Sequence, residues 1–301
     1  MPPLSKLWRA LRRKAGGSES SYLRGKLLAE IEGWTWPFWS ERPNRVPVHV
    51  LTSGKDWRLA AWMLASWFHM TEQGWHVVIH DDGTLPADAR RVFEKLFASA
   101  RIVPRGEADA AVRRVLHAFP FCADYRALSS RALKVFDAVH FAKGNRLIVL
   151  DSDVLFFKKP REILGWTAAE NGECWFNEGS TEEALVSASE AREEFGIRLW
   201  QRVNTGICLL EKSAIDFDFC DRALAETSLL RGQVHRIEPT LFSLCASRHG
   251  RGGLLPKSYE VSLDRAAADT AISRHYAGAM RERFFADGLS RVRDPLFAEG
   301  H

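Results

Sequence analysis

Short apolar runs alternate with helical patterns over the first part of the chain. Three runs predict strands, at residues 46–51, 75–80 and 101–103. Two intervening stretches predict helices, one through Trp57, Ala61, Leu64 and Phe68 and one through Val92, Phe93 and Leu96. This alternation indicates βαβ units and a largely parallel sheet flanked by helices, which is an α/β fold. Ligands bind such sheets at the carboxyl ends of the strands, so the loops at 52–56 and 81–83 are candidate binding segments.

A helix and a strand in the middle of the chain lead into paired acids. Residues 129–142 read as a helix that Gly144 breaks, and the apolar run at 146–150 predicts a buried strand. Asp-Ser-Asp follows directly at 151–153, and the apolar run resumes at 154–157. Two carboxylates this close repel each other, and burial raises the penalty. A divalent cation removes both problems, so the pattern predicts a Mg²⁺ or Mn²⁺ site. The alternative is a pair of solvated acids in a surface turn.

The second half of the chain is patterned less regularly, which predicts a small mixed region. Strands are expected at 174–176 and from 203 into the apolar run 208–210, and helices at 181–194, 214–229 and 237–247. We expect three parts: a basic, tryptophan-rich lead-in at 1–44, a single domain at 45–290 and a C-terminal tail at 291–301.

Composition places the chain among ordinary globular proteins, because 46% of its 301 residues are hydrophobic and 27% are charged. The net charge of +4 is concentrated at one end. Residues 1–26 hold seven basic side chains and one acid, a charge of +6, which leaves −2 for the remainder. This distribution argues against a general nucleic-acid-binding surface.

The cysteine pattern and the N-terminal segment bear on location. The five cysteines are scattered and form no Cys-x-x-Cys pair, which argues against a disulfide framework and a structural zinc site. No apolar run approaches the ~20 residues that span a bilayer, so we expect a cytoplasmic protein. Apolar residues of segment 1–15 recur at helical spacing among basic ones, which predicts either peripheral contact with an anionic membrane or a solvated leader.

Two enzyme classes place Asp-x-Asp after an apolar strand. One is the nucleotide-sugar glycosyltransferases of the GT-A fold, and the other is the haloacid-dehalogenase-like phosphatases. Leu-Asp-Ser-Asp-Val matches the phosphatase motif literally. That motif normally opens its domain and needs a later Gly-Asp-x-x-x-Asp pair, whereas here an α/β pattern precedes residue 151 and no such pair follows 153.

Motifs spread over residues 46–285 resemble the GT-A glycosyltransferases, especially the retaining family 8, the branch that includes glycogenin and bacterial lipopolysaccharide glycosyltransferases. Val-His-Val-Leu-Thr-Ser-Gly resembles the family's first strand and nucleotide loop, and Arg-Leu-Ile-Val-Leu-Asp-Ser-Asp-Val-Leu its metal-binding strand. Val-Asn-Thr-Gly-Ile-Cys-Leu-Leu and Ser-Arg-His-Tyr-Ala-Gly resemble two later segments in the same order. The resemblance implies a nucleotide-diphosphate sugar, expected to be a UDP-sugar, and transfer with retention.

The resemblance also assigns roles to individual residues. Asp151, Asp153 and His275 would hold the metal, and the imidazole favours Mn²⁺ modestly over Mg²⁺. Asn204 would lie beside the transferred sugar, and Glu238 would orient sugar hydroxyls or the acceptor. Structural readings compete, because Asn-Thr-Gly is also an ordinary turn and Glu-Pro also opens a helix well.

Ten residues are expected to bind the donor. Arg281 stands where the family has a lysine on the diphosphate, although the family's following Pro-Trp is absent here. Gly278 would allow a phosphate to approach the backbone, and Lys134 matches a lysine near the donor. The full set is Thr52, Ser53, Gly54, Asp56, Arg131, Lys134, Ser152, Gly206, Gly278 and Arg281.

The sequence therefore predicts a metal-dependent glycosyltransferase that moves a sugar from a nucleotide-diphosphate sugar to a glycan, glycolipid or other acceptor. The alternatives are a dehalogenase-type phosphatase that uses Asp151 and Asp153, and a nucleotide-sugar-binding protein without turnover. Enzymes of the resembling bacterial type often build glycolipids or polysaccharides at the inner membrane face, which a basic leader would suit.

Overall fold

The computed structural model describes residues 25–35, 37–38, 42–180, 184–226, 229–261 and 266–298. The expected contact of segment 1–15 with a membrane lies outside the described residues. Among the helices that are described, none combines the length and the apolar character needed to cross a membrane.

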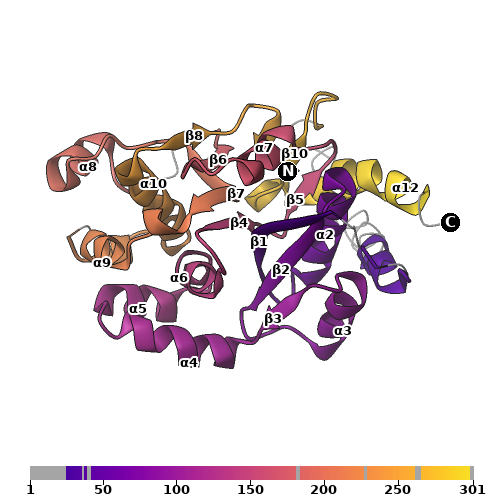
Figure 1. The fold of residues 1–301 in the computed structure, drawn as a ribbon, viewed down its shortest axis with the longest axis horizontal. Helices are drawn as coiled ribbons and strands as arrows, with labels where there is room; N and C mark the ends of the chain where they lie inside the picture. Colours follow the sequence, from indigo (N-terminus) through magenta and orange to yellow (C-terminus); the bar gives the residue numbers. More distant parts are fainter. Residues whose placement is uncertain are drawn as a thin grey trace, which may run out of the picture.

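A seven-stranded sheet forms the centre of the molecule, in the order β3-β2-β1-β4-β7-β6-β8 (Figure 1). Strands β3, β2, β1 and β4 pair in parallel, β7 is antiparallel to both β4 and β6, and β6 is parallel to β8. Strand β7 is buried along almost its whole length, as expected of a central strand that is covered on both faces. The prediction of a mainly parallel α/β sheet is confirmed. The strands are β1 Pro43–Thr52, β2 Gly74–Asp81, β3 Arg101–Val103, β4 Arg146–Leu150, β6 Cys174–Glu178, β7 Val203–Glu211 and β8 Gly252–Leu254.

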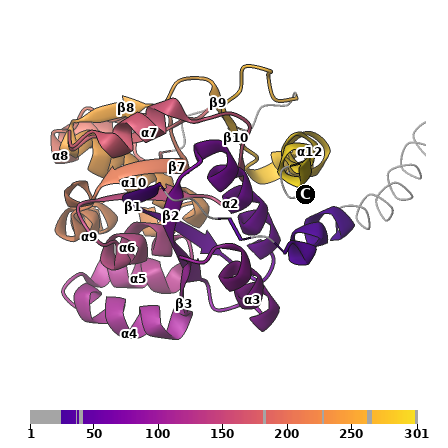
Figure 2. The ribbon, with the colours of Figure 1, turned by 45° about the vertical axis from the view of Figure 1, so that its right-hand side comes forward.

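Helices cover both faces of this sheet, as Figures 1 and 2 show from two directions. On one face, one apolar core joins the alternate residues Val48 and Val50 of β1 to α2 Trp57–Thr71, α3 Ala87–Leu96, α7 Arg161–Ala168 and α12 Ser290–Ala298. On the other face, Leu147 and Val149 of β4 join a second core with α4 Arg105–Leu116, α5 Pro120–Leu128, α6 Ala132–Phe141, α8 Ala188–Phe195, α9 Phe217–Glu226 and α10 Ile237–His249. The short helix α11 Arg281–Arg283 and the π-helical segment η6 Phe284–Leu289 lead into α12, and 3₁₀ turns lie at Glu30–Gly33, Lys212–Ala214, Leu229–Arg231, Val234–Arg236 and Gly278–Met280.

A second sheet of three strands, in the order β5-β10-β9, brings the end of the chain back to the paired acids. Its strands are β5 Val154–Phe156, β9 Tyr259–Val261 and β10 Ser273–His275. Strand β10 is antiparallel to β5 and places His275 opposite Val154. The Tyr276 N–H then donates to the Asp153 carbonyl at 2.9 Å. Backbone pairing therefore fixes the histidine beside the Asp-Ser-Asp segment.

Three predicted helices have the wrong starts, and local hydrogen bonds explain two of them. Helix α8 begins at Ala188 and not at 181, because Ser187 forms a reciprocal capping box with Glu190. Helix α9 begins at Phe217 and not at 214, because the Asp216 carboxylate accepts the N–H groups of residues 218 and 219. Helix α6 begins at Ala132 and not at 129. The pattern did not predict α4, α5 or α7.

Two histidines lie buried against each other on neighbouring strands of the large sheet. His49 Nδ1 is 2.9 Å from His80 Nε2, and the two rings are stacked with centroids 5.2 Å apart. Burial is the largest cause that lowers both pKa values, to about 3 for His80 and well below the ordinary value for His49. Both rings are therefore neutral in the folded protein near pH 7, and one donates a hydrogen bond to the other.

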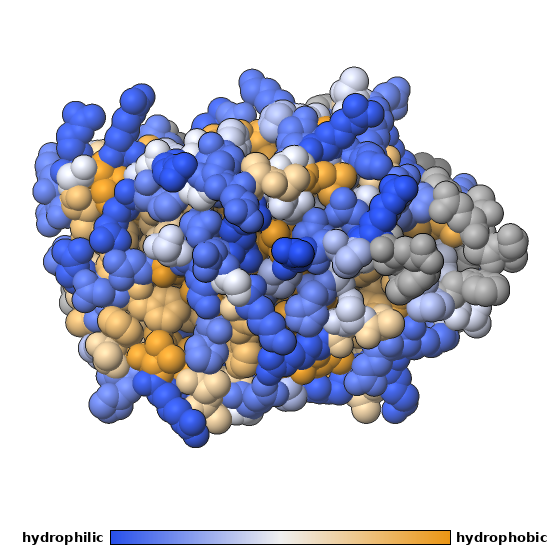
Figure 3. All heavy atoms as spheres, in the orientation of Figure 1, coloured by the Kyte–Doolittle hydropathy of each residue, from blue (hydrophilic) through white to orange (hydrophobic). Residues whose placement is uncertain are grey.

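Hydrophilic residues cover most of the face in Figure 3, and apolar residues gather at the lower left, over α5 and α9. Among the described residues, the large apolar side chains that are exposed are Phe121 and Leu128, both on α5. The other large apolar side chains whose burial the structure describes are at least partly buried, as expected of a well-packed α/β domain.

A candidate divalent metal and donor site

A cavity of about 720 Å³ opens at the carboxyl ends of β1 and β4. It contains most of the residues that the sequence singled out. Thirteen of the fifteen line it: Thr52, Ser53, Asp56, Arg131, Lys134, Asp151, Ser152, Asp153, Asn204, Glu238, His275, Gly278 and Arg281. The other two, Gly54 and Gly206, do not line the cavity.

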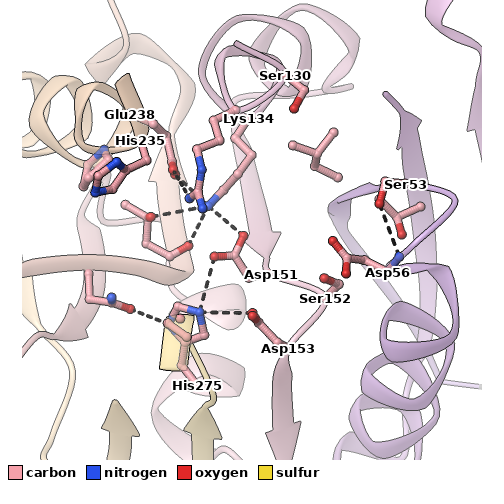
Figure 4. A pocket seen from close by; sticks show the side chains of 18 of the residues that line it. Ser53, Asp56, Ser130, Lys134, Asp151, Ser152, Asp153, His235, Glu238 and His275 are labelled. Atoms are coloured by element: carbon pink, nitrogen blue, oxygen red, sulfur yellow. Dashed lines mark hydrogen bonds and ion pairs between the residues drawn. The ribbon is translucent and has the colours of Figure 1, made fainter. Parts of the chain in front are cut away.

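Two carboxylates and an imidazole converge in this cavity (Figure 4). Asp151 and Asp153 follow β4, and His275 ends β10. His275 Nε2 is 3.1 Å from Asp153 Oδ1 and 3.5 Å from Asp151 Oδ2. One ligand atom from each of the three side chains lies within 4.8 Å of the other two. Among the described residues, these three side chains form the group of acids, histidines or cysteines whose spacing would allow them to hold a metal ion.

Asn204 fixes which nitrogen of His275 faces the acids. The Gly206 N–H donates to Asn204 Oδ1 at 3.1 Å, which identifies this atom as the amide oxygen. His275 Nδ1 lies 2.8 Å from the same oxygen and must therefore carry the hydrogen. Nε2 is then the nitrogen whose lone pair points towards Asp151 and Asp153. Ligating histidines in proteins are usually held by such a hydrogen bond on the second nitrogen.

Gly206 leaves the space that the imidazole fills. A Cβ atom at this position would lie 2.4 Å from His275 Nδ1 and 2.6 Å from its Cγ. The Gly206 carbonyl also accepts the Asp151 N–H at 2.9 Å. The glycine therefore positions two of the three candidate ligands from behind, without lining the cavity itself.

The electrostatics of the triad fit a bound cation. Burial lowers the pKa of His275, but the charge and hydrogen bond of Asp153 and the charge of Asp151 outweigh it, so the pKa is raised. Burial raises the pKa of Asp153, but His275 and Arg281 outweigh it, so the pKa is lowered. Negative charge thus accumulates around His275 Nε2. Two carboxylates and one imidazole suit a divalent first-row metal or Mg²⁺.

Lys134 is buried, and its ammonium group lies between the carboxylates of Asp151 and Glu238 (Figure 4). Its Nζ is 2.7 Å from Asp151 Oδ1 and 2.6 Å from Glu238 Oε1, and it donates to the Thr205 carbonyl at 3.0 Å. Burial lowers the pKa of Lys134, but the charges of Asp151 and Glu238 outweigh it, so the pKa is raised and the lysine is charged. Glu238 is fully buried in the first turn of α10, and Arg131 lies 3.5 Å from its second oxygen.

Arg281, the first residue of α11, bridges two carboxylates that line the cavity. Its Nε donates to Asp153 Oδ2 at 2.9 Å and its Nη1 to Asp56 Oδ1 at 3.0 Å. The side chain is 43% exposed, so the remaining N–H groups of the guanidinium can reach solvent in the cavity. Gly278, three residues earlier, has a φ of +57°, a left-handed conformation that favours glycine.

The loop after β1 forms the opposite wall and the start of α2. The Ser53 hydroxyl accepts the Lys55 and Asp56 N–H groups at 3.2 Å, and the Ser53 carbonyl accepts Trp57 N–H. Gly54 packs outward, where a Cβ atom would lie 2.6 Å from the Thr84 carbonyl oxygen. Gly54 therefore allows this loop to pack against the segment that contains Thr84. Thr52, Ser53 and Asp56 line the cavity.

Several cavity residues were not predicted. They are Leu51, Asp82, Ser130, Thr205, His235, Arg236, Pro239 and Ala277. Asp82 lies within the loop 81–83 that the strand pattern had marked, and Thr205 lies inside the Asn-Thr-Gly motif. His235 and Arg236 belong to a 3₁₀ turn before α10, where no periodic or motif signal marks them.

Comparison with known proteins identifies the fold only. No protein-family model matches the sequence, and no curated protein matches it either. Among solved structures, the apo form of mouse xyloside xylosyltransferase 1 superposes with a TM-score of 0.54 at 12% identity, over 76% of this chain and 97% of that one.

Two further structures are similar. An active-site mutant of LgtC matches with a TM-score of 0.51 at 13% identity, over 83% of this chain and 96% of that chain. The apo bifunctional glycosyltransferase WbbM matches with a TM-score of 0.51 at 10% identity, over 89% of this chain and 53% of that one. The chain therefore has the GT-A fold that the sequence motifs led us to expect.

Proposed function

We propose that the protein is a metal-dependent glycosyltransferase that uses a nucleotide-diphosphate sugar, with UDP as the nucleotide and Mn²⁺ as the preferred metal. The observation that carries the proposal is the convergence of Asp151, Asp153 and His275, with the tautomer of His275 set by Asn204. The GT-A fold adds support, because two of the three similar structures are named as a xylosyltransferase and a bifunctional glycosyltransferase. The same fold does not favour the phosphatase alternative.

The chemistry requires charge stabilisation at two places. As the bond between sugar C1 and the diphosphate breaks, negative charge grows on the leaving phosphate and positive charge on the sugar. A bound divalent metal supplies Lewis-acid stabilisation of the diphosphate. Arg281 donates its spare N–H groups to the same phosphates, since Asp153 and Asp56 occupy only Nε and Nη1.

Three residues hold the candidate metal ligands in position. Lys134 holds Asp151 Oδ1 and leaves Oδ2 facing His275, and Glu238 holds Lys134 in turn. The complete burial of Glu238 favours a positioning role through Lys134. Asn204 holds His275 and would also lie beside the transferred sugar. Retention at C1 remains the outcome that the family resemblance implies.

Substrates and location follow from the proposed reaction. The donor is a nucleotide sugar and the acceptor a glycan or glycolipid, and residues 45–290 form the catalytic domain. We place the protein in the cytoplasm, with segment 1–15 as a tether to the anionic inner membrane face. Deleting residues 1–18 should abolish binding to anionic liposomes, and unaltered binding would remove the tether from the proposal.

A thermal-shift experiment tests the site. UDP should raise the unfolding temperature only with Mn²⁺ present. A ligand at about 100 times its Kd stabilises the folded state by about 2.7 kcal/mol, which sets the size of the expected shift. Asp153→Asn and His275→Gln should lose the shift, whereas Asp88→Asn, an exposed carboxylate on α3, should keep it. Stabilisation by UDP without metal would contradict the proposed site. Hydrolysis of p-nitrophenyl phosphate that Asp151→Asn abolishes would favour the phosphatase.

A further inference from the structure

A second cavity, of about 280 Å³, lies between α7, β6 and the segment after β8. It shares no lining residue with the site described above. Leu209 of β7 lines it, five residues along the strand from Asn204, which corresponds to about 17 Å. Its volume is near the lower end of the range for small-molecule pockets and leaves room for one sugar ring.

Trp175 gives this cavity a flat aromatic wall. In the sheet, Trp175 pairs with Leu209 on one side and with Gly253 on the other. A Cβ atom on Gly253 would lie 3.4 Å from the indole Cζ3, so the ring lies across the glycine. The indole N–H donates to Glu173 Oε2 at 3.0 Å, which fixes the ring in its plane. Trp175 is only partly buried and lines the cavity.

Two carboxylates line the same cavity as the indole. Glu162 Oε2 accepts the Tyr259 hydroxyl at 2.8 Å, and Glu173 Oε2 accepts the Asn171 amide at 2.7 Å. The other oxygen of each carboxylate has no partner among the described residues. The lining includes two carboxylates but no lysine or arginine. An anionic ligand is therefore disfavoured, whereas hydroxyl groups would satisfy the carboxylates as donors.

An exposed glycine of α7 lies in the cavity lining. Gly165 lines it, and no atom lies within 4 Å of the place where a Cβ would stand. Glycine inside a helix is less stable than alanine, so its presence here is not explained by the helix itself. A larger side chain at this position would meet no other atom at its Cβ and would change the cavity lining.

We propose that this cavity binds one neutral pyranose ring of a glycan chain, with the apolar face of the ring on Trp175 and its hydroxyls on Glu162 and Glu173. An indole with two carboxylates, and with no lysine or arginine in the lining itself, has the chemistry for such a ring. Its use as an anchor for the acceptor or product chain rests on the proposed glycosyltransferase function, but the binding itself does not.

The test is a tryptophan-fluorescence titration of the full chain with cellohexaose, maltohexaose and mannohexaose, in the presence of UDP and Mn²⁺. At least one should bind. Gly165→Leu adds a bulky side chain to the cavity lining and should weaken that binding at least about tenfold. The matched control is Gly106→Leu on α4, where a Cβ likewise meets no atom within 4 Å, and it should bind as the wild type does.

Two further variants separate the outcomes. Trp175→Ala should abolish the binding, with its fold checked by the unfolding temperature. His275→Gln should lose the UDP–Mn²⁺ thermal shift but keep oligosaccharide binding, so failure of the transferase proposal is visible separately. The proposal is overturned if the wild type binds none of the three oligosaccharides, or if Gly165→Leu binds as tightly as Gly106→Leu.

Discussion

Asn204 connects the candidate metal site to the backbone of β7, and Asn204→Ala tests that connection. The substitution removes the acceptor 2.8 Å from His275 Nδ1, while the histidine stays 5% exposed. The imidazole then has no fixed tautomer and no fixed ring orientation. Both are needed for Nε2 to face Asp151 and Asp153.

The expected loss is in metal affinity. Removing the partner that orients a ligating histidine typically lowers affinity about 10–100-fold, which corresponds to about 1.4–2.7 kcal/mol. The buried N–H group left without an acceptor also costs about 1–3 kcal/mol of folding stability, which is a separate effect from the loss of metal affinity. Asn204→Asp keeps an oxygen within reach of Nδ1 and should bind Mn²⁺ at least as tightly as the wild type.

The assay is a Mn²⁺ titration in which electron paramagnetic resonance reports the free ion. Asn44→Ala is the matched control, since its amide donates to Gln73 and Thr167, away from the cavity. A urea titration verifies that each variant is folded. If Asn204→Ala binds Mn²⁺ within about twofold of the wild type, the reasoning on the tautomer of His275 is refuted.

Three other predictions concern the packing around the site and the buried histidines. Gly206→Ala places a Cβ 2.4 Å from His275 Nδ1 and should weaken Mn²⁺ binding more than about tenfold in the same titration; unchanged binding would show that the imidazole can move aside. Lys134→Met removes the cation 2.6 Å from buried Glu238 and leaves it the more distant Arg131 at 3.5 Å. The variant should lower the free energy of unfolding by about 3–5 kcal/mol in urea, a loss that adding Glu238→Gln should partly restore. An equal or larger loss in the double variant would contradict that pairing. His80 has a pKa lowered to about 3, so below pH 6.5 the unfolded state binds the extra proton and stability falls as pH falls. Between about pH 6 and 4, His80→Gln should reduce the slope of the unfolding free energy against pH by about 1.4 kcal/mol per pH unit. A slope identical to that of the wild type would show that this ring does not titrate on unfolding.

The sequence was sufficient for the features that depend on local pattern. Continuous apolar runs marked β1, β2 and β4, because strands buried on both faces have few polar residues. The acids after β4 were also informative, because two carboxylates one residue apart at the end of a buried strand need a counter-charge. His275 followed from its motif and not from periodicity.

What the sequence did not predict depends on contacts between distant segments. Pairing of β10 with β5 sets the distance from His275 to Asp153, and short strands of three residues carry little pattern. The ion pair between Lys134 and Glu238 joins two helices, and neither residue marks the other in the sequence. The boundaries of α8 and α9 were missed because single side-chain caps, and not hydrophobic spacing, set them.

Turnover of a nucleotide sugar tests the central claim most directly. UDP release from UDP-glucose, UDP-galactose, UDP-xylose, UDP-N-acetylglucosamine and UDP-N-acetylgalactosamine should be measured with Mn²⁺ and with a chelator. We expect release from at least one donor that requires the metal and that Asp153→Asn and His275→Gln abolish, while Asp88→Asn retains it. Release from none of these donors by a wild-type protein that binds UDP and Mn²⁺ would contradict the account and favour a binding protein without turnover.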